Sequence, residues 1–412
     1  MNRLVLIGNG FDLAHRLKTS YQDFIDWYWD GRFSYLKECF TSVSKAALCD
    51  VAVKGFPSWY SLFQEGPSVL YEKSGTELFL ELCRRGICRP SMSPLFERIH
   101  KSIETKGWVD IENDYYELLK KYVLDNASEV QVDDLNTQLH DLQTLLVKYL
   151  KSIEIPETLL KTEVRQKIYA PFIKQDISIE SQWALKEHIE TGLKKNDWFW
   201  DDKLKQYGSS CYTVGRVAEY SVKYSDKTNK REVPPEELFL PNHIMLVNFN
   251  YTSTAQMYLK ESSIFTLNHI HGDLKEPKSV IFGYGDELDD DYKTILNKNE
   301  NKFLGKIKSI KYLEADNYRR LLSFIESEPY QVLIMGHSCG NSDRTLLNTL
   351  FEHKNCVSIK PYYHQKGEND DNYIELVQNI SRNFKDMKLM RDRVVNKTYC
   401  EPLTKKSIPR QK

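Results

Sequence analysis

Runs of consecutive apolar residues stand at the start of the chain and again after residue 240. Each run is short and rich in β-branched or aromatic side chains, and several contain no polar position. Uninterrupted runs of this length are typical of strands buried on both faces of a parallel sheet. The runs cover residues 4–7, 243–249, 263–270, 279–282, 331–335 and 355–359. The pattern predicts an α/β fold built on a mostly parallel, Rossmann-like sheet.

The long stretch between these runs has a different period. Apolar or aromatic residues recur at steps of three and four in residues 76–83, 114–123 and 133–153, which predicts amphipathic helices. Residues 107–112 carry acids where the first turn of a helix would begin. We therefore expect a large, all-helical insertion after the first strand–helix unit.

Changes in composition indicate how these parts are divided. Residues 223–235 are polar and end in Val-Pro-Pro, which is typical of a linker before the sheet resumes. The predicted nucleotide-binding domain comprises residues 1–30 and 240–395, and the helical insertion comprises residues 31–239. Residues 396–412 contain two prolines and scattered basic side chains, and we expect them to form a flexible tail.

Polar or glycine-rich clusters follow five of the predicted strands. The clusters are residues 8–12, 248–252, 269–272, 283–286 and 336–343. In an open α/β sheet, ligands bind outside the carboxyl ends of the strands, where clusters of this kind meet. The sequence therefore predicts a nucleotide-binding site at this edge of the sheet.

The first cluster has the composition of a phosphate-binding turn. It consists of Gly8, Asn9, Gly10, Phe11 and Asp12. A Gly-x-Gly turn between a strand and a helix presents backbone N–H groups to a phosphate. The dinucleotide fingerprint requires a third glycine where Leu13 stands, and no Walker motif is present. The alternative is an ordinary strand–turn–helix junction in which Asp12 caps the helix.

Asn250 and His271 are the predicted catalytic residues. The amide of Asn250 can donate and accept hydrogen bonds, which suits it to hold a water molecule or a ribose hydroxyl. The imidazole of His271 can act as a general base near neutral pH. Gly272 leaves room for a ligand, and Thr252 belongs to the same predicted ligand site. A metal site is not expected here, because the sequence shows no third ligand at the usual spacing.

The last cluster adds groups that suit a ribose. Ser338, Asn341 and Asp343 can hydrogen bond to ribose hydroxyls, and Gly336 lets the backbone approach the ligand closely. His337 is counted in the same predicted site. Asp343 has an alternative role as a helix cap, since Asp is favoured at that position.

Composition and charge exclude several classes of protein. Of 412 residues, 41% are hydrophobic and 28% are charged, which is normal for a globular protein. A net charge of −1 predicts no general affinity for nucleic acid. The eight cysteines include no Cys-x-x-Cys pair, so we expect neither a zinc site nor a disulfide framework. Without a signal-peptide pattern or an apolar run near about 18 residues, a cytoplasmic protein without membrane contact is expected.

In this order, the clusters resemble the AbiH family of bacteriophage abortive-infection proteins. The resemblance rests on Gly-Asn-Gly-Phe-Asp at 8–12, Phe-Asn-Tyr-Thr at 249–252, His-Ile-His-Gly at 269–272 and Gly-His-Ser-x-Gly-Asn-Ser-Asp at 336–343. Trp-Val-Asp-Ile-Glu at 108–112 also looks like that family. The sequence assigns no role to Trp108, Asp110 or Glu112.

AbiH proteins are in turn similar to the sirtuin-like NAD-handling enzymes of antiphage defence. In those enzymes, an Asn after a later strand and a His before a Gly act on the nicotinamide–ribosyl bond. Asn250 and His271 occupy those motif positions in this chain. The resemblance therefore implies an NAD glycohydrolase that limits phage spread by depleting NAD, with NAD as its substrate and no metal.

The chain departs from the sirtuin-like pattern in three ways. Sirtuin-like enzymes usually read Gly-Ala-Gly-x-Ser at the first turn, where this chain has Asn9, Phe11 and Asp12. The Asp that is common two residues after the catalytic Asn is replaced by Thr252. The Cys-x-x-Cys pairs that hold zinc in protein deacetylases are absent, which argues against deacetylation. A nucleotide-binding sensor or toxin scaffold without NADase activity therefore stays open as an alternative.

The sequence also leaves the partners of the chain open. A nucleotide ligand is expected at the strand ends. A homo-oligomer and a phage-derived trigger or partner protein are both compatible with the resemblance. Action on nucleic acid, with the helical insertion as the reader, is a third alternative that the net charge of −1 disfavours.

Overall fold

The computed structural model describes residues 1–106, 110–125, 127–208, 214–225, 233–368 and 370–405. These residues form two compact units. Unit 1 comprises Met1–Arg16, Ile155–Asp273 and Tyr312–Lys412. Unit 2 comprises Leu17–Glu154 and Leu274–Lys311.

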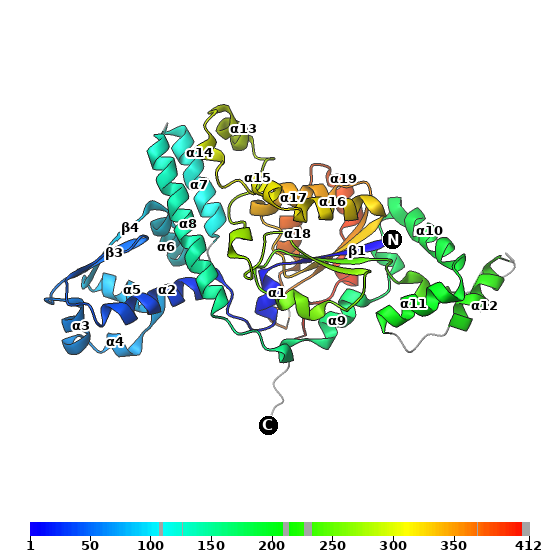
Figure 1. Ribbon diagram of the computed structural model, residues 1–412, viewed down its shortest axis with the longest axis horizontal. Coiled ribbons are helices and arrows are strands. Elements are labelled where there is room, and N and C mark those ends of the chain that lie inside the picture. Colours follow the sequence, from blue (N-terminus) through cyan, green and yellow to red (C-terminus); the bar gives the residue numbers. More distant parts are fainter. Residues whose placement is uncertain (107–109, 126, 209–213, 226–232, 369, 406–412) are drawn as a thin grey trace, which may run out of the picture. The chain divides into compact units, whose positions relative to one another are not determined.

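Unit 1 is built on a parallel sheet (Figure 1). Within the described residues its strands are β1 (Asn2–Ile7), β5 (Ile244–Asn248), β6 (Phe265–His269), β7 (Tyr330–Met335) and β8 (Cys356–Tyr362). They pair in the order β6-β5-β1-β7-β8, and every pair is parallel. Numbered along the chain this order is 3-2-1-4-5, which doubly wound nucleotide-binding sheets share. The predicted α/β fold with a Rossmann-like sheet is confirmed.

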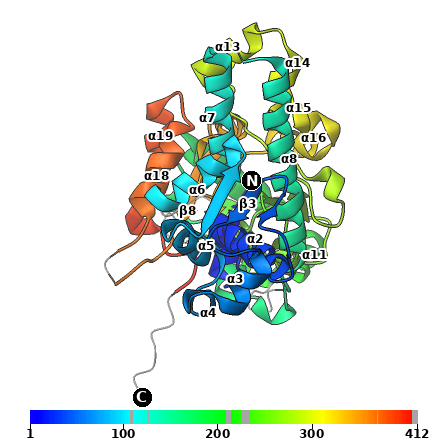
Figure 2. The same ribbon diagram turned by 90° about the vertical axis from the view of Figure 1, so that its left-hand side faces the viewer.

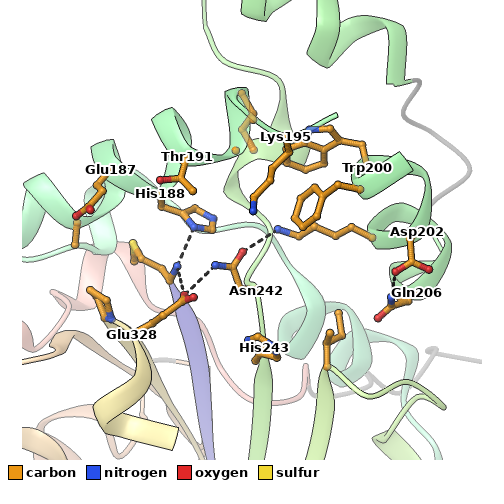
Figure 3. A pocket seen from close by; sticks show the side chains of 18 residues that line it. Glu187, His188, Thr191, Lys195, Trp200, Asp202, Gln206, Asn242, His243 and Glu328 are labelled. Carbon is orange, nitrogen blue, oxygen red and sulfur yellow. Dashed lines mark hydrogen bonds and ion pairs between the residues drawn. The ribbon is translucent and has the colours of Figure 1, made fainter. Parts of the chain in front are cut away.

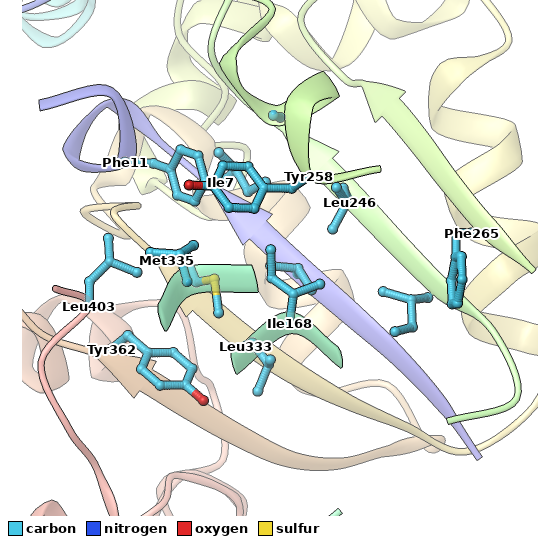
Figure 4. Close-up of a cluster of buried hydrophobic side chains, with 14 of the residues drawn as sticks. Ile7, Phe11, Ile168, Leu246, Tyr258, Phe265, Leu333, Met335, Tyr362 and Leu403 are labelled. Carbon is cyan, nitrogen blue, oxygen red and sulfur yellow. The ribbon is translucent and has the colours of Figure 1, made fainter. Parts of the chain in front are cut away.

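Burial on both faces explains why uninterrupted apolar runs form this sheet. In β1, alternate side chains point to opposite faces, and Leu4, Val5, Leu6 and Ile7 are all fully buried. Val5 and Ile7 belong to a cluster that also contains Phe11, and Figure 4 shows Ile7 and Phe11 among the side chains of this cluster. A polar residue at any of these four positions would be removed from water without a partner.

Helices cover both faces of this sheet. In Figure 1, α16 and α17 lie on one side of the strands, and α1 and α9 lie on the other. The helices of unit 1 are α1 (Asn9–Ala14), α9 (Thr162–Tyr169), α10 (Gln182–Leu193), α11 (Asp197–Tyr207), α12 (Val214–Ser225), α16 (Asn317–Ser327), α17 (Arg344–Phe351), α18 (Tyr373–Arg382) and α19 (Met387–Arg393).

Unit 2 is mainly helical (Figure 2). Its helices are α2 (Tyr21–Leu36), α3 (Trp59–Glu65), α4 (Val69–Glu72), α5 (Gly75–Arg84), α6 (Pro94–Lys106), α7 (Ile111–Leu124), α8 (Glu129–Lys151), α13 (Asp290–Asn297), α14 (Asn301–Leu304) and α15 (Lys308–Lys311). The three helices predicted from periodicity are confirmed as α5, α7 and α8. Unit 2 also contains an antiparallel sheet of β2 (Val43–Ser44), β3 (Cys49–Val53) and β4 (Cys88–Met92), so the insertion is not all-helical.

One predicted strand is wrong. Val280, Ile281 and Phe282 are buried and Ser279 is half-buried, but none of the four pairs with a strand in the described part of the chain. They belong to unit 2, where the side chain of Gln143 donates to the carbonyl of Val280 at 2.8 Å. Burial in a helical unit makes this segment apolar, as burial in a sheet would. The polar cluster at 283–286 is therefore not a strand end of the parallel sheet.

The acidic motif at the start of α7 has structural contacts within unit 2. Trp108 lies outside the described residues. The Asp110 carboxylate caps α7 by accepting from the backbone N–H of Asn113 at 3.1 Å. Glu112 is buried, pairs with Lys308 at 2.9 Å and accepts from the backbone N–H of Gly283 at 3.1 Å. Through these two contacts, Glu112 joins α7 to residues 283 and 308 of the same unit.

The compact units differ from the division predicted from the sequence. Residues 155–239 belong to the unit with the parallel sheet, and residues 274–311 belong to the helical unit. The expected flexible tail also differs over its described part. Leu403 is 5% exposed, joins the core beneath the sheet, and donates its backbone N–H to the carbonyl of Tyr363 at 2.9 Å.

The loops after β1 and β7 touch each other directly. The backbone N–H of Gly10 donates to the carbonyl of Gly336 at 2.8 Å. Gly336 has φ of +76°, and a Cβ atom there would lie 2.0 Å from the backbone nitrogen of Phe11. A Cβ at Gly8 would lie 2.5 Å from the Cα of His337. Glycine is required at these positions because two backbones occupy the space that side chains would need.

We predict that Gly336→Ala lowers the free energy of unfolding by about 3 kcal/mol or more. The new Cβ would meet backbone on one side, and the left-handed φ adds strain. Gly340→Ala is the matched control, since Gly340 has φ of −70° and its Cβ would meet only the Ser338 hydroxyl at 3.6 Å. Urea denaturation of both variants tests the difference, and an equal loss would contradict it.

Candidate functional site

Four of the predicted polar clusters lie at one edge of the parallel sheet. They follow β1, β5, β6 and β7, whose carboxyl ends meet because the strands run in the same direction. The register pairs Asn248 with His269, so Asn250 and His271 each stand two residues beyond a matched pair. Gly8 follows the central strand β1, and Gly336 follows its neighbour β7. The order of strands reverses between β1 and β7, which makes this the position where doubly wound sheets bind ligands.

Asn250 is held by the first loop. Its side-chain nitrogen donates to the carbonyl of Gly8 at 3.0 Å, and its backbone N–H donates to the Asn248 side chain at 3.2 Å. Because the amide nitrogen must face the Gly8 carbonyl, the orientation of the amide is fixed. No described residue donates to the Oδ1 atom of Asn250. That oxygen can accept a hydrogen bond from a water molecule or a hydroxyl group.

His271 is buried and oriented by two neighbours. Its Nε2 atom lies 3.2 Å from Oδ1 of Asp343 and 3.1 Å from the Tyr312 hydroxyl. The imidazole is parallel to the Tyr312 ring, with centroids 6.1 Å apart, and meets the edge of Phe249 at 5.3 Å. A carboxylate at Nε2 favours the tautomer with the proton on that nitrogen, which leaves Nδ1 as the basic nitrogen.

A second histidine faces the same carboxylate. His337 Nδ1 accepts from the backbone N–H of Cys339 at 2.9 Å, so the neutral ring carries its proton on Nε2. That Nε2 atom lies 3.6 Å from Oδ2 of Asp343. The ring of Phe249 contacts both histidines, and its centroid lies 4.1 Å from that of His337. Asp343 stands at the start of α17, but its side chain makes no capping hydrogen bond there, so it serves the histidines.

Asp12 lies in the first helix with its carboxylate buried. It accepts from the Thr252 hydroxyl at 2.6 Å through Oδ2, while Oδ1 has no hydrogen-bond partner among the described residues. Burial raises the pKa of Asp12 to about 6, although donors on Thr252, Thr254 and Asn250 act in the opposite direction. Gly8, not Asp12, occupies the N-cap position, so the alternative in which Asp12 caps the helix is wrong.

The chain matches the family described as bacteriophage abortive infection AbiH over residues 4–364. The chain belongs to the AbiH family. This result confirms the family that the sequence motifs predicted, and it gives the chain a role in antiphage abortive infection. Comparison with curated proteins and with solved structures gave no match.

The glycine turn of this AbiH chain differs from an open phosphate cradle. The N–H of Gly8 donates to the Met335 carbonyl at 3.3 Å, and that of Gly10 donates to Gly336. The N–H of Phe11 donates to the Gly8 carbonyl at 2.9 Å. These donors are used within the protein, so the glycines bring two loops together and do not present a row of N–H groups.

The remaining residues of the predicted ligand site differ in how exposed they are to solvent. Asn9, Ser338 and Asn341 are exposed. Gly272 has φ of +77° and turns the chain directly after His271. Cys339 is fully buried, and burial raises the pKa of its thiol, so it is not a reactive nucleophile.

Two aromatic residues of the site escaped the sequence analysis. Phe249 stands inside the Phe-Asn-Tyr-Thr motif, directly before Asn250, and its position in that motif was the available signal. Tyr312 contacts His271 from a segment that carries no recognisable motif, and its ring stacks on Tyr318 with centroids 5.3 Å apart. Only the folded chain brings Tyr312 to this edge.

Two further properties of the described residues concern metal binding and membrane crossing. No group of three or more His, Cys, Asp or Glu side chains among them could hold a metal ion. None of the helices in the described ranges combines the length and the apolar character needed to cross a membrane.

We predict that Asp12→Asn changes how stability depends on pH. The folded pKa near 6 exceeds the unfolded value of about 3.9, so the native state binds more protons between pH 4 and pH 6. The free energy of unfolding of the wild type therefore falls as pH rises through that window. The variant lacks this loss, so its stability relative to wild type should rise by up to about 3 kcal/mol.

Urea denaturation at pH 4 and pH 7 measures this change. Asp201→Asn, at an exposed position on α11, is the control and should show a constant difference from wild type. If Asp12→Asn also differed from wild type by the same free energy of unfolding at both pH values, the Asp12 carboxylate would have the same pKa in the folded and unfolded states, and the prediction would be wrong.

Proposed function

We propose that this AbiH chain hydrolyses NAD at the bond between nicotinamide and ribose. In this proposal His271 is the general base and Asn250 positions the attacking water. The supporting observation is a histidine oriented by Asp343, at the sheet edge where the amide oxygen of Asn250 has no donor among the described residues. The 3-2-1-4-5 order of the strands supports a nucleotide as the ligand at that edge.

The chemistry follows from these groups. Asn250 Oδ1 accepts a hydrogen bond from the water and fixes its oxygen toward the anomeric carbon. As that oxygen forms its bond to carbon, the carbon–nitrogen bond breaks and its electron pair leaves with nicotinamide as a neutral molecule. The proton lost by the water goes to Nδ1 of His271, while Asp343 stabilises the resulting imidazolium. The products are nicotinamide and ADP-ribose.

The Asp12–Thr252 pair also supports a relation to the sirtuin-like pattern. That pattern has a hydroxyl where Asp12 stands and a carboxylate where Thr252 stands. Here the two groups have exchanged positions, and the hydrogen bond between them is present at 2.6 Å. The two departures noted in the sequence therefore compensate for each other, and the loop that carries Asn250 is held to the first helix.

One observation favours the alternative of a nucleotide-binding protein without NADase activity. The N–H groups of Gly8, Gly10 and Phe11 bind protein carbonyls, so the turn has less to offer a pyrophosphate. Calorimetry with NAD and ADP-ribose distinguishes the two functions. Tight binding of NAD without formation of nicotinamide, also in lysate of phage-infected cells, would favour the sensor.

We predict that His271→Ala lowers NAD turnover by roughly 10²–10⁴-fold, because the general base is lost. Mass spectrometry of nicotinamide and ADP-ribose, in infected-cell lysate and with purified protein, measures this rate. His140→Ala, at an exposed position on α8, is the matched control and should keep the wild-type rate. Wild-type activity in the His271→Ala variant, or no NAD cleavage by wild type in either sample, would remove the proposal.

We predict that Asp343→Asn lowers kcat by about 10²-fold and leaves KM within about twofold of wild type. The amide keeps the shape of the side chain but does not stabilise a positive charge on His271. Asp343 therefore acts as a positioning residue, and the split between kcat and KM separates this role from a structural one. A loss of kcat that is accompanied by a lower melting temperature would instead indicate a structural role.

A further inference from the structure

A second site is present at the opposite edge of the same sheet. A cavity of about 470 Å³ lies where β5, β6 and β7 begin, beneath α10 and α11 (Figure 3). Asn242 and His243 precede β5, and Glu328 and Pro329 precede β7. The volume falls within the range of pockets that bind small molecules. All of its lining residues belong to unit 1 and none belongs to the candidate NAD site.

Lys203 is unusual among the residues of this cavity because its charged side chain is buried. It is 6% exposed, and its ammonium donates to the carbonyl of Leu240 at 3.0 Å and to the Asn242 side chain at 3.2 Å. No carboxylate among the described residues forms an ion pair with it. An ammonium has three donors, so one N–H remains for a further acceptor. A buried cation without a counter-ion is costly, which favours an anionic occupant.

A second cation and two aromatic rings stand beside Lys203. The Lys195 ammonium lies 5.0 Å from the ring centroid of Phe199 and forms no ion pair within the described part of the chain. The Lys203 ammonium lies 5.7 Å from the Phe199 ring and 5.3 Å from the Trp200 ring. Trp200 is 2% exposed, and its indole N–H has no hydrogen-bond partner in the described residues. Figure 3 shows Lys195 and Trp200 on the same side of the cavity.

Two carboxylates that line the cavity, those of Asp202 and Glu328, already accept hydrogen bonds within the protein, and the donor to Asp202 is the Gln206 side chain. Glu328 pairs with the Met1 amino group at 2.9 Å and accepts from the Asn242 side chain at 2.9 Å. Figure 3 shows Glu187 and Glu328 on the side of the cavity away from Lys195. One end of the cavity therefore has two aromatic rings, two cations that form no ion pair among the described residues, and an indole N–H that has no partner among them.

We propose that this cavity binds a small organic anion that carries an aromatic ring. The acidic group lies against Lys203 and Lys195, and the ring contacts Phe199 and Trp200. This site is separate from the site at the carboxyl ends of the strands, so it does not depend on the proposed NAD hydrolysis.

Indole-3-acetate and its neutral analogue indole-3-acetamide test the proposal by isothermal titration calorimetry with the full chain. The two probes have the same ring and nearly the same shape and differ in charge. We expect saturable binding of indole-3-acetate and at least about 10-fold weaker binding of the amide, because charge-assisted hydrogen bonds are lost. Lys203→Met and Lys195→Met should each weaken indole-3-acetate by about 10-fold. Lys195 is exposed, so its variant reports on the site even if Lys203→Met disturbs folding.

Lys205→Met is the control, since Lys205 is exposed on the same helix and does not line the cavity. It should bind indole-3-acetate as the wild type does, and so should His271→Ala. Three outcomes overturn the proposal: no binding tighter than about 1 mM, equal affinity for the two probes, or an equal loss in Lys205→Met.

Discussion

The contact between the loops after β1 and β7 is the constraint on which the geometry of unit 1 depends. Neighbouring strands lie about 4.8 Å apart, so the loops that leave them must pass within contact distance. Gly8, Gly10 and Gly336 make this passage possible by omitting side chains, and one hydrogen bond joins Gly10 to Gly336. This bond fixes where α1 begins. The position of α1 then decides which side chains of the first loop can reach the loop after β5.

Two hydrogen bonds join the first loop to the loop after β5, which contains the candidate residue Asn250. The carbonyl of Gly8 receives the Asn250 amide, and the Asp12 carboxylate receives the Thr252 hydroxyl. Both hold the loop after β5 from the same side. Burying Asp12 costs free energy, which appears as its raised pKa, and a hydroxyl at that position would avoid this cost. The hydrogen bond from Thr252 therefore holds the loop at the expense of a buried carboxylate.

The sequence was sufficient to predict the parallel sheet and most of the polar residues at the carboxyl ends of its strands. Apolar runs identified five strands, because strands buried on both faces cannot contain unpaired polar groups. The same rule failed at residues 279–282, where burial in a helical unit gives the same pattern. Local sequence also could not reveal that the N–H of Gly10 would donate to the carbonyl of Gly336, since the two residues are 326 positions apart in the chain. Tyr312 escaped for the same reason, because its contact with His271 is set by the fold alone.

The two lysines of the cavity at the other edge could not be predicted as binding residues from the sequence. Lys195 and Lys203 belong to a polar stretch with many charges, and such residues are usually solvated. Burial of Lys203 arises because α11 packs over the amino ends of the strands, where Leu240 and Asn242 supply acceptors. A buried ammonium with an unused donor is less stable than an apolar side chain of similar size would be. Lys203 lies beside two aromatic rings and an indole N–H that has no partner among the described residues, and these are the contacts from which the anion site is proposed.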